Sequence, residues 1–263
     1  MTGGLIKKFR ILILLYVLLM ISGTAWLTKA RTTDWDRALT VAIYPINGDD
    51  SKVTQDYIES LNFEIFKEIE DFFNREAKNY QLMLKKPIDI DLAPEITDKP
   101  PAPPFGQSVL SVMYWSLKLR YWSWSRDNYK YPKDIMIFVL YFDPENNKSV
   151  SHSLGLQKGL VGIVNAFASK KMAAENNIVI THELLHTIGA SDKYNPGTNQ
   201  PIFPIGYAEP DLDPTFPQTK AEIMGGRIPV NETKAEIPTG LDKTVLGEAT
   251  AFEIHWLTER SND

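Results

Sequence analysis

Apolar and polar residues follow one another along this chain with periods that predict a succession of strands and helices. Apolar or alternating runs predict strands over Leu39 to Ile46, Ile88 to Leu92, Asp134 to Phe142 and Gly159 to Phe167. Apolar spacings of three and four predict helices over Ser51 to Leu82, Ser108 to Arg126, Asn176 to Ile188 and Leu241 to Leu257. Strands that alternate with helices in this order indicate an α/β (α+β) fold.

The first two predicted helices each carry an apolar stripe that we expect to pack on the sheet. In the helix of 51–82 the stripe consists of Ile58, Leu61, Ile65, Ile69 and Phe72. In the helix of 108–126 it consists of Leu110, Tyr114, Leu117, Tyr121 and Trp124. Basic side chains accompany the aromatic ones in this second helix, so docking on a lipid surface is a further interpretation of it.

The N-terminal segment carries Lys7, Lys8 and Arg10 before an uncharged run from Ile11 to Thr28. Such a run is long enough for a short membrane span, and the positive flank places the N-terminus in the cytoplasm. A signal peptide cleaved near Gly23-Thr24-Ala25 is the alternative, and removal of residues 1–25 would then give a secreted protein. Both interpretations place the remaining chain outside the cytoplasmic membrane.

Composition limits the function classes. A chain of 263 residues with 43% hydrophobic residues can bury one sizeable core, and a net charge of −5 argues against binding nucleic acid. The chain has no cysteine, which excludes disulfides, thiolate ligands and a cysteine nucleophile. It also argues against a eukaryotic secreted domain and favours a bacterial one.

These observations divide the chain into three parts. We expect a membrane anchor or signal peptide over residues 1–28, a polar linker over 29–38 and one folded domain over 39–263. Within that domain, residues 39–189 carry the regular elements. Residues 190–263 are rich in proline up to position 217 and irregular before the last helix.

The sequence Thr181-His182-Glu183-Leu184-Leu185-His186 holds the strongest chemical signal. Residues four apart share one face of a helix, so the imidazoles of His182 and His186 can reach one metal ion. Glu183 lies beside them, where a carboxylate can act as a general base on water.

The residues after this helix make the pattern more specific. Gly189 can adopt the left-handed conformation that ends a helix, so the chain can turn back and bring Asp192 to the metal. The whole pattern reads H-E-x-x-H-x-x-G-x-x-D. Glu209 and Glu222 are alternative third ligands, but neither lies on a convincing helix, so we favour Asp192.

This pattern resembles the metzincin zinc peptidases, with aspartate as third ligand as in the snapalysin-type variants. Residues 221–226 (Ala-Glu-Ile-Met-Gly-Gly) resemble the Met-turn, which implies that Met224 supports the site from below without binding the metal. The resemblance implies a twisted mixed sheet with an edge strand over the cleft, a motif helix, an irregular lower subdomain and a C-terminal helix. We expect the strand of 159–167 to be that edge strand.

The resemblance implies that the irregular segment of residues 193–220 forms the floor of the cleft and the wall of the specificity pocket. Many metzincins carry a tyrosine two residues after the methionine, whereas this chain has Gly226 there. Tyr194 and Tyr207 are therefore the candidates for stabilising the oxyanion. His152 is expected to be an exposed loop residue or, alternatively, a polar residue at the rim of the cleft. His255 is expected to be a structural residue of the last helix.

Together these features predict a membrane-anchored, extracytoplasmic endopeptidase with one Zn²⁺ held by His182, His186 and Asp192. Glu183 would be the general base that acts on metal-activated water, and the partners would be a peptide or protein substrate and the lipid membrane. The alternative is a membrane-tethered module that binds zinc without turnover. In that case a fourth protein ligand would close the metal site.

Overall fold

The computed structural model describes residues 7–16, 19, 23, 32–104 and 108–259. The chain forms two compact units, residues 1–36 and residues 37–263. In the first unit, residues 7–16 are helical. Among the described residues, no helix combines the length and the apolar character needed to cross a bilayer. Most of the predicted anchor and the first residues of the predicted linker lie outside the described residues.

The second unit has a mixed α/β fold built on a five-stranded mixed sheet, which confirms the predicted fold class at this level. The strand order is β2-β1-β3-β5-β4. Four strands are parallel, and β4 pairs antiparallel with β5. The strands are β1 (Leu39–Asn47), β2 (Ile88–Leu92), β3 (Ile135–Phe142), β4 (Leu154–Leu156) and β5 (Val161–Phe167).

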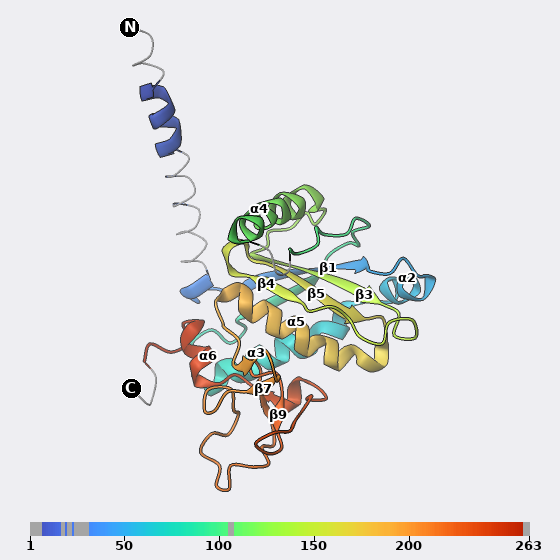
Figure 1. Ribbon diagram of the computed structural model, residues 1–263, viewed down its shortest axis with the longest axis vertical. Coiled ribbons are helices and arrows are strands. Elements are labelled where there is room, and N and C mark those ends of the chain that lie inside the picture. Colours follow the sequence, from blue (N-terminus) through green and yellow to red (C-terminus); the bar gives the residue numbers. More distant parts are fainter. Residues whose placement is uncertain (1–6, 17–18, 20–22, 24–31, 105–107, 260–263) are drawn as a thin grey trace. The chain divides into compact units, whose positions relative to one another are not determined.

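Helices cover both faces of this sheet (Figure 1), which explains why its central strands are apolar on both sides. Helix α4 (Val109–Arg126) lies on one face, where Trp115 and Leu119 pack into the same core as Phe138 of β3. Helices α3 (Lys67–Asn79) and α5 (Ala173–Ile188) lie on the other face.

The helix predicted over 51–82 is wrong as a single element. The structure has α2 (Lys52–Glu59), a 3-10 turn η1 (Phe63–Phe66) and then α3. Asn62 is extended between them, with φ −144° and ψ 170°. At this interruption Asn177 of α5 donates to the carbonyl of Ile65 at 2.8 Å. The turn between the two helices is therefore linked to the motif helix.

The edge-strand prediction is also wrong. Strand β5 lies inside the sheet between β3 and β4, and the edge belongs to β4, in a segment that looks like a loop in sequence. Gly155 of β4 lies so close to α5 that an added Cβ would collide with the carbonyl of Glu183 and with Cβ of His186. A glycine at this place therefore lets the edge strand lie directly against the motif helix.

Helix α4 has the predicted bounds, but its stripe does not pack on the sheet. Leu110, Tyr114, Leu117, Tyr121 and Trp124 are all exposed, and the buried residues are Trp115, Leu119 and Ser123. Both sides of this helix are apolar, so periodicity could not decide which side faces the core.

The chain after α5 is mostly irregular, as predicted, and contains short strand pairs. The pairs are β6 (Tyr194–Asn195) with β7 (Gln200–Pro201), β8 (Ala221–Glu222) with β11 (Thr244–Val245) and β9 (Ile228–Pro229) with β10 (Ala235–Glu236). The helix predicted over 241–257 is too long. The structure has a 3-10 turn η4 (Leu241–Lys243), then β11, and only then α6 (Glu248–Glu253), because residues 244–245 pair with β8.

Candidate metal centre

Helix α5 places His182 and His186 one turn apart on the same side. Nδ1 of His182 donates to the carbonyl of Ile223 at 3.0 Å, and Nδ1 of His186 donates to the carbonyl of Ala190 at 2.8 Å. A carbonyl only accepts, so each Nδ1 carries a proton, and in the neutral imidazole each Nε2 has a lone pair. An imidazole whose Nδ1–H donates to a backbone carbonyl is oriented in the way that metal-binding histidines are, with Nε2 toward the metal.

Gly189 ends α5 in the predicted left-handed conformation, with φ 119°. Its N–H donates to the carbonyl of His186, and the N–H of Ala190 donates to the carbonyl of Leu185. Any other residue at position 189 would be strained, and a Cβ there would lie 2.9 Å from Nε2 of Gln157.

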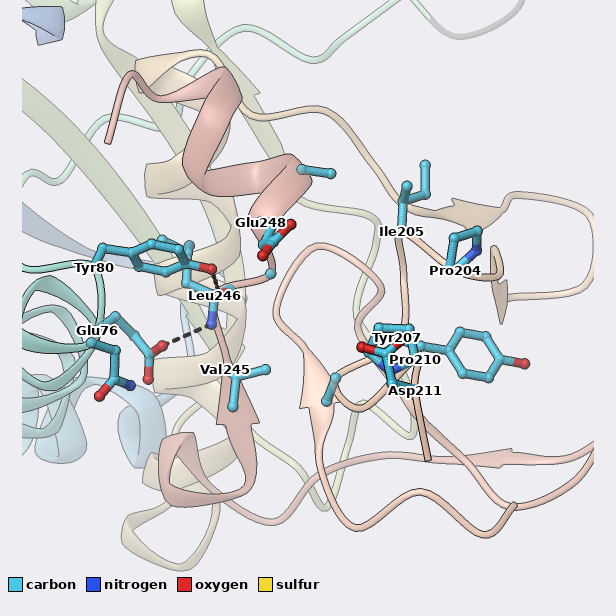
Figure 2. Close-up of a pocket in the computed structure, with 14 residues that line it drawn as sticks. Glu76, Tyr80, Pro204, Ile205, Tyr207, Pro210, Asp211, Val245, Leu246 and Glu248 are labelled. Carbon is cyan, nitrogen blue, oxygen red and sulfur yellow. Dashed lines mark hydrogen bonds between the residues drawn. The ribbon is translucent and has the colours of Figure 1, made fainter. Parts of the chain in front are cut away.

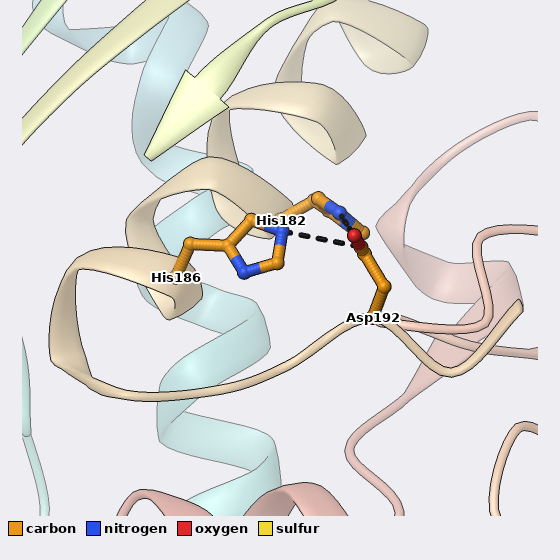
Figure 3. Close-up of side chains that lie close together, drawn as sticks. All are labelled: His182, His186 and Asp192. Atoms are coloured by element: carbon orange, nitrogen blue, oxygen red, sulfur yellow. Dashed lines mark hydrogen bonds and ion pairs between the residues drawn. The ribbon is translucent and has the colours of Figure 1, made fainter. Parts of the chain in front are cut away.

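The turn brings Asp192 to the two histidines (Figure 3). Oδ1 of Asp192 lies 3.1 Å from Nε2 of His182 and 3.2 Å from Nε2 of His186. One ligand atom from each of the three residues falls within 4.8 Å of the others, and the structure groups no other His, Cys, Asp or Glu with them among the described residues. The three predicted ligands are thus brought together.

Electrostatics couple the three side chains. Burial alone would raise the pKa of Asp192, but the hydrogen bonds and charges of His182 and His186 lower it far below its usual range. Burial alone would lower the pKa of His182. The hydrogen bond with Asp192 and the charge of Glu183 outweigh this effect, so the pKa of His182 is raised above its usual value. A divalent cation between these groups would satisfy the carboxylate and both Nε2 lone pairs at once.

Glu183 is buried beside the histidines, with 6% of its surface exposed. Burial raises its pKa, while the charges of His182 and His186 oppose the shift. The N–H of Gly155 in the edge strand also hydrogen-bonds to Glu183. The other oxygen, Oε2, is buried without a hydrogen-bond partner among the described residues. A buried orphan oxygen next to a possible cation is a site for a water molecule or a substrate group.

The predicted Met-turn is a tight turn under the histidines. The N–H groups of Gly225 and Gly226 both donate to the carbonyl of Glu222, and Gly226 has φ 71°. Met224 is fully buried, and its carbonyl accepts from the N–H of Lys193, next to Asp192. The turn therefore supports His182 through Ile223 and the Asp192 segment through Met224.

The alternative ligands lie elsewhere. Glu222 is fully buried and accepts hydrogen bonds from Gly225, Gly247 and Thr250. Glu209 accepts from the N–H and the hydroxyl of Thr219. Neither carboxylate belongs to the group around the histidines.

The two tyrosine candidates have different surroundings. The ring of Tyr194 lies 6.4 Å from that of His182. Burial raises its pKa, and Asp192 and Glu183 add to the shift through their charges. Tyr207 instead packs against Phe203 and Phe216. The structure thus brings Tyr194, and not Tyr207, to the centre.

The two remaining histidines are outside the centre. His152 is exposed in the loop before β4, and its carbonyl accepts from Asn165. His255 is exposed after α6, with φ 63°.

A cavity of about 300 Å³ adjoins His182. It is lined by residues of the loop before β4, of β5 and α5, and of the segment from Ile223 to Ile237, with Glu175 and Arg227 as its charged members. The segment 193–220, expected to form the wall of the specificity pocket, does not line it. That segment borders a separate cavity of about 540 Å³ between α3 and α6, which none of the three ligands lines (Figure 2).

Sequence reasoning missed the residues that hold Asp192 in place. Nζ of Lys193 is buried and donates to Oε2 of Glu253 at 2.6 Å and to the carbonyl of Ser191 at 2.8 Å. The N–H and hydroxyl of Ser191 also donate to Glu253. A buried lysine and a glutamate sixty positions away give no local pattern, so only the fold reveals this pair.

Comparison with known proteins adds little to this description. No family model matches the chain, and no match is found among curated protein sequences. Among solved structures, the chain is similar to one described as "Structure of a chaperone-substrate complex", with 16% identity and a TM-score of 0.38. The match covers 83% of this chain and only 33% of the other. A likeness at this level does not identify a family.

Proposed function

We propose that this protein is a zinc-dependent endopeptidase. The observation that carries the proposal is the convergence of Nε2 of His182, Nε2 of His186 and Oδ1 of Asp192 beside the buried carboxylate of Glu183. The likeness of residues 182–226 to the metzincin motifs supports the same conclusion.

The donor set fits zinc. Two imidazole nitrogens and one carboxylate oxygen are ligands that Zn²⁺ accepts, and three protein ligands leave a position open, as in catalytic zinc sites. When bound there, the ion supplies a Lewis acid that acidifies water and polarises a carbonyl. Within the described residues no fourth acidic, histidine or cysteine side chain closes the centre, which favours a catalytic site over a purely structural one.

Glu183 is suited to move the proton. Its carboxylate is buried with Oε2 free, and burial raises its pKa toward the range in which a general base works at neutral pH. Glu183 accepts the proton of the attacking water and passes it to the departing amine nitrogen. The ring of Tyr194 lies near that of His182 and its hydroxyl hydrogen-bonds to Asp192, so this hydroxyl is the candidate donor to the developing oxyanion.

The surroundings fit an extended peptide. Strand β4 is the edge of the sheet and lies directly on α5, which supports binding of an extended substrate along this edge. The cavity of about 300 Å³ beside His182 can take one side chain of that peptide. The basic flank and apolar run of residues 7–28 support a location at the outer side of the cytoplasmic membrane.

The test combines metal analysis with a digest. The purified full chain should hold one zinc ion per molecule and cleave a mixed-peptide substrate, and a chelator should stop cleavage until zinc is restored. Zinc without cleavage would point to the non-catalytic binding module. No zinc at all would overturn both functions.

A further inference from the structure

The outer face of helix α4 is apolar where a surface helix is normally polar. This face, called here the α4 stripe, consists of Leu110, Met113, Tyr114, Leu117, Tyr121 and Trp124, each between 58% and 76% exposed. At 3.6 residues per turn these positions fall within an arc of about 100°, so they form one continuous band. A contiguous exposed apolar band marks a docking surface.

The helix cannot turn this band inward. Its opposite side is fixed to the sheet by Trp115 and Leu119, and Nε1 of Trp115 donates to the carbonyl of Pro101 at 2.8 Å. At its C-terminal end, Asp127 accepts from the hydroxyl of Tyr44 at 2.6 Å. The α4 stripe is therefore held outward, on the side of the sheet opposite to α5 and the histidines (Figure 1).

The charge around the stripe is strongly biased. Residues 109–133 hold five basic residues and one acidic residue, in a chain whose net charge is −5. The neighbouring carboxylates are paired, Asp98 with Arg126 and Asp127 with Lys133. Lys118 and Lys130 are exposed and form no ion pair with any described residue. Because no described carboxylate neutralises them, the positive charges of Lys118 and Lys130 are available to attract an anionic surface.

The side chains of the α4 stripe and the positive charge around it indicate which kind of partner binds there. Tyrosine and tryptophan mixed with aliphatic side chains are typical of helices that lie in the headgroup region of a bilayer, with cations beside them. A second copy paired through the same face would bring two basic segments together, which opposes association. Anionic lipid is complementary to the same segment.

We propose that the α4 stripe docks on the surface of a membrane that contains anionic lipids, with Lys118 and Lys130 near the lipid phosphates. Docking through this face turns the α5 side of the domain, with the histidines, away from the bilayer. The N-terminal segment would attach the chain to the membrane, whereas the α4 stripe would fix the orientation of the domain. The inference does not depend on peptidase activity.

The absence of native cysteine allows a direct test on the full chain. Single variants Leu117→Cys and Tyr121→Cys are labelled with the environment-sensitive fluorophore NBD, and Met83→Cys, at a position that is 100% exposed, is the control. Each protein is reconstituted into vesicles of phosphatidylcholine with or without phosphatidylglycerol. Thermal melting checks that the labelled variants stay folded.

In anionic vesicles, emission from positions 117 and 121 should shift to the blue, rise several-fold and be quenched by nitroxide-labelled lipids. Emission from position 83 should not change. Adding Lys118→Gln and Lys130→Gln should weaken docking about fivefold for each cation removed. A water-like spectrum at 117 and 121 in anionic vesicles would overturn the proposal. A blue shift without lipid that grows with protein concentration would overturn it too, in favour of self-association.

Discussion

Nζ of Lys193 lies 2.6 Å from Oε2 of Glu253, and this ion pair holds the residue after Asp192 against the end of α6. Only 2% of the lysine side chain is exposed, so its charge depends on this partner. The pair links the last helix to the proposed metal ligand, although sixty residues separate them in the chain.

Breaking this pair should therefore affect both stability and metal binding. Glu253→Gln leaves the charge of Lys193 buried without its carboxylate, and we expect a loss of about 3 kcal/mol in the free energy of unfolding. Zinc affinity should fall roughly 10-fold or more, because Asp192 loses its support. Denaturant unfolding and zinc titration against a competing chelator measure the two effects.

The matched control is Glu236→Gln, which breaks the exposed pair of Lys234 and Glu236 at the same distance of 2.6 Å. That change should cost less than about 1 kcal/mol and leave zinc binding unchanged. Equal effects of the two variants would show that the buried pair has no special role in holding Asp192.

Two variants distinguish the proposed role of Glu183 from that of His186. Glu183→Gln should retain zinc and lower kcat by about 100-fold or more, since only the proton acceptor is lost. His186→Ala should lose both zinc and activity. Zinc content per molecule and steady-state peptide cleavage distinguish them, with His255→Ala, in the exposed residue after α6, as the control. Normal turnover by Glu183→Gln would refute its assignment as the base.

Gly189 should be required for the return of Asp192. Gly189→Ala forces a Cβ into a left-handed conformation and toward Nε2 of Gln157, and we expect it to cost about 1–2 kcal/mol of stability and to weaken zinc binding. Gly226→Ala also places a Cβ in a left-handed conformation but meets nothing within 4 Å, so the comparison separates backbone strain from the contact with Gln157. If Gly189→Ala binds zinc as tightly as the native protein, the Gly189 turn does not set the ligand geometry.

Tyr194 should matter mainly for the rate. Tyr194→Phe removes the hydroxyl, which hydrogen-bonds to Asp192, while keeping the ring near His182, so kcat should fall by roughly 100-fold with KM unchanged. Tyr207→Phe should have little effect, because that side chain packs against Phe203 and Phe216. An unchanged kcat for Tyr194→Phe would remove this residue from the mechanism.

Asp127 should make the stability of the domain depend on pH. Burial alone would raise its pKa, but hydrogen bonds from Lys133 and Tyr44 outweigh this effect and lower it. Because the folded-state pKa is below that of the unfolded chain, the stabilisation is present at neutral pH and is lost as the pH falls through the folded-state pKa.

Asp127→Asn should therefore reduce the free energy of unfolding by about 2 kcal/mol at neutral pH, and the difference from the native protein should shrink in acid. Asp56→Asn, in the exposed pair of Asp56 with Lys52, is the control and should change stability by less than about 0.5 kcal/mol. A difference for Asp127→Asn that is the same at every pH would contradict the role of the charge.

Local patterns predicted much of this fold. The apolar runs of β1, β3 and β5 are typical of buried strands. The helix predicted over 176–188 follows from its apolar spacing and its closing glycine, and the structure begins it three residues earlier, at Ala173. Long-range contacts decided the rest. Residues 52–79 form two helices with a 3-10 turn between them, and Asn177 of α5 donates to the carbonyl of Ile65 in that turn. Residues 244–245 pair with β8 in place of continuing the predicted last helix.

The arrangement of the candidate ligands could be predicted from local sequence, because two imidazoles at positions i and i+4, a glycine three residues later and a carboxylate three beyond it constrain one another through helix geometry alone. Contacts between distant parts of the chain set which strand forms the edge beside the motif helix, which carbonyls orient the histidines, and which face of α4 remains exposed. These features depend on residues far apart in the chain, and a helix that is apolar on both sides does not indicate which side meets the sheet.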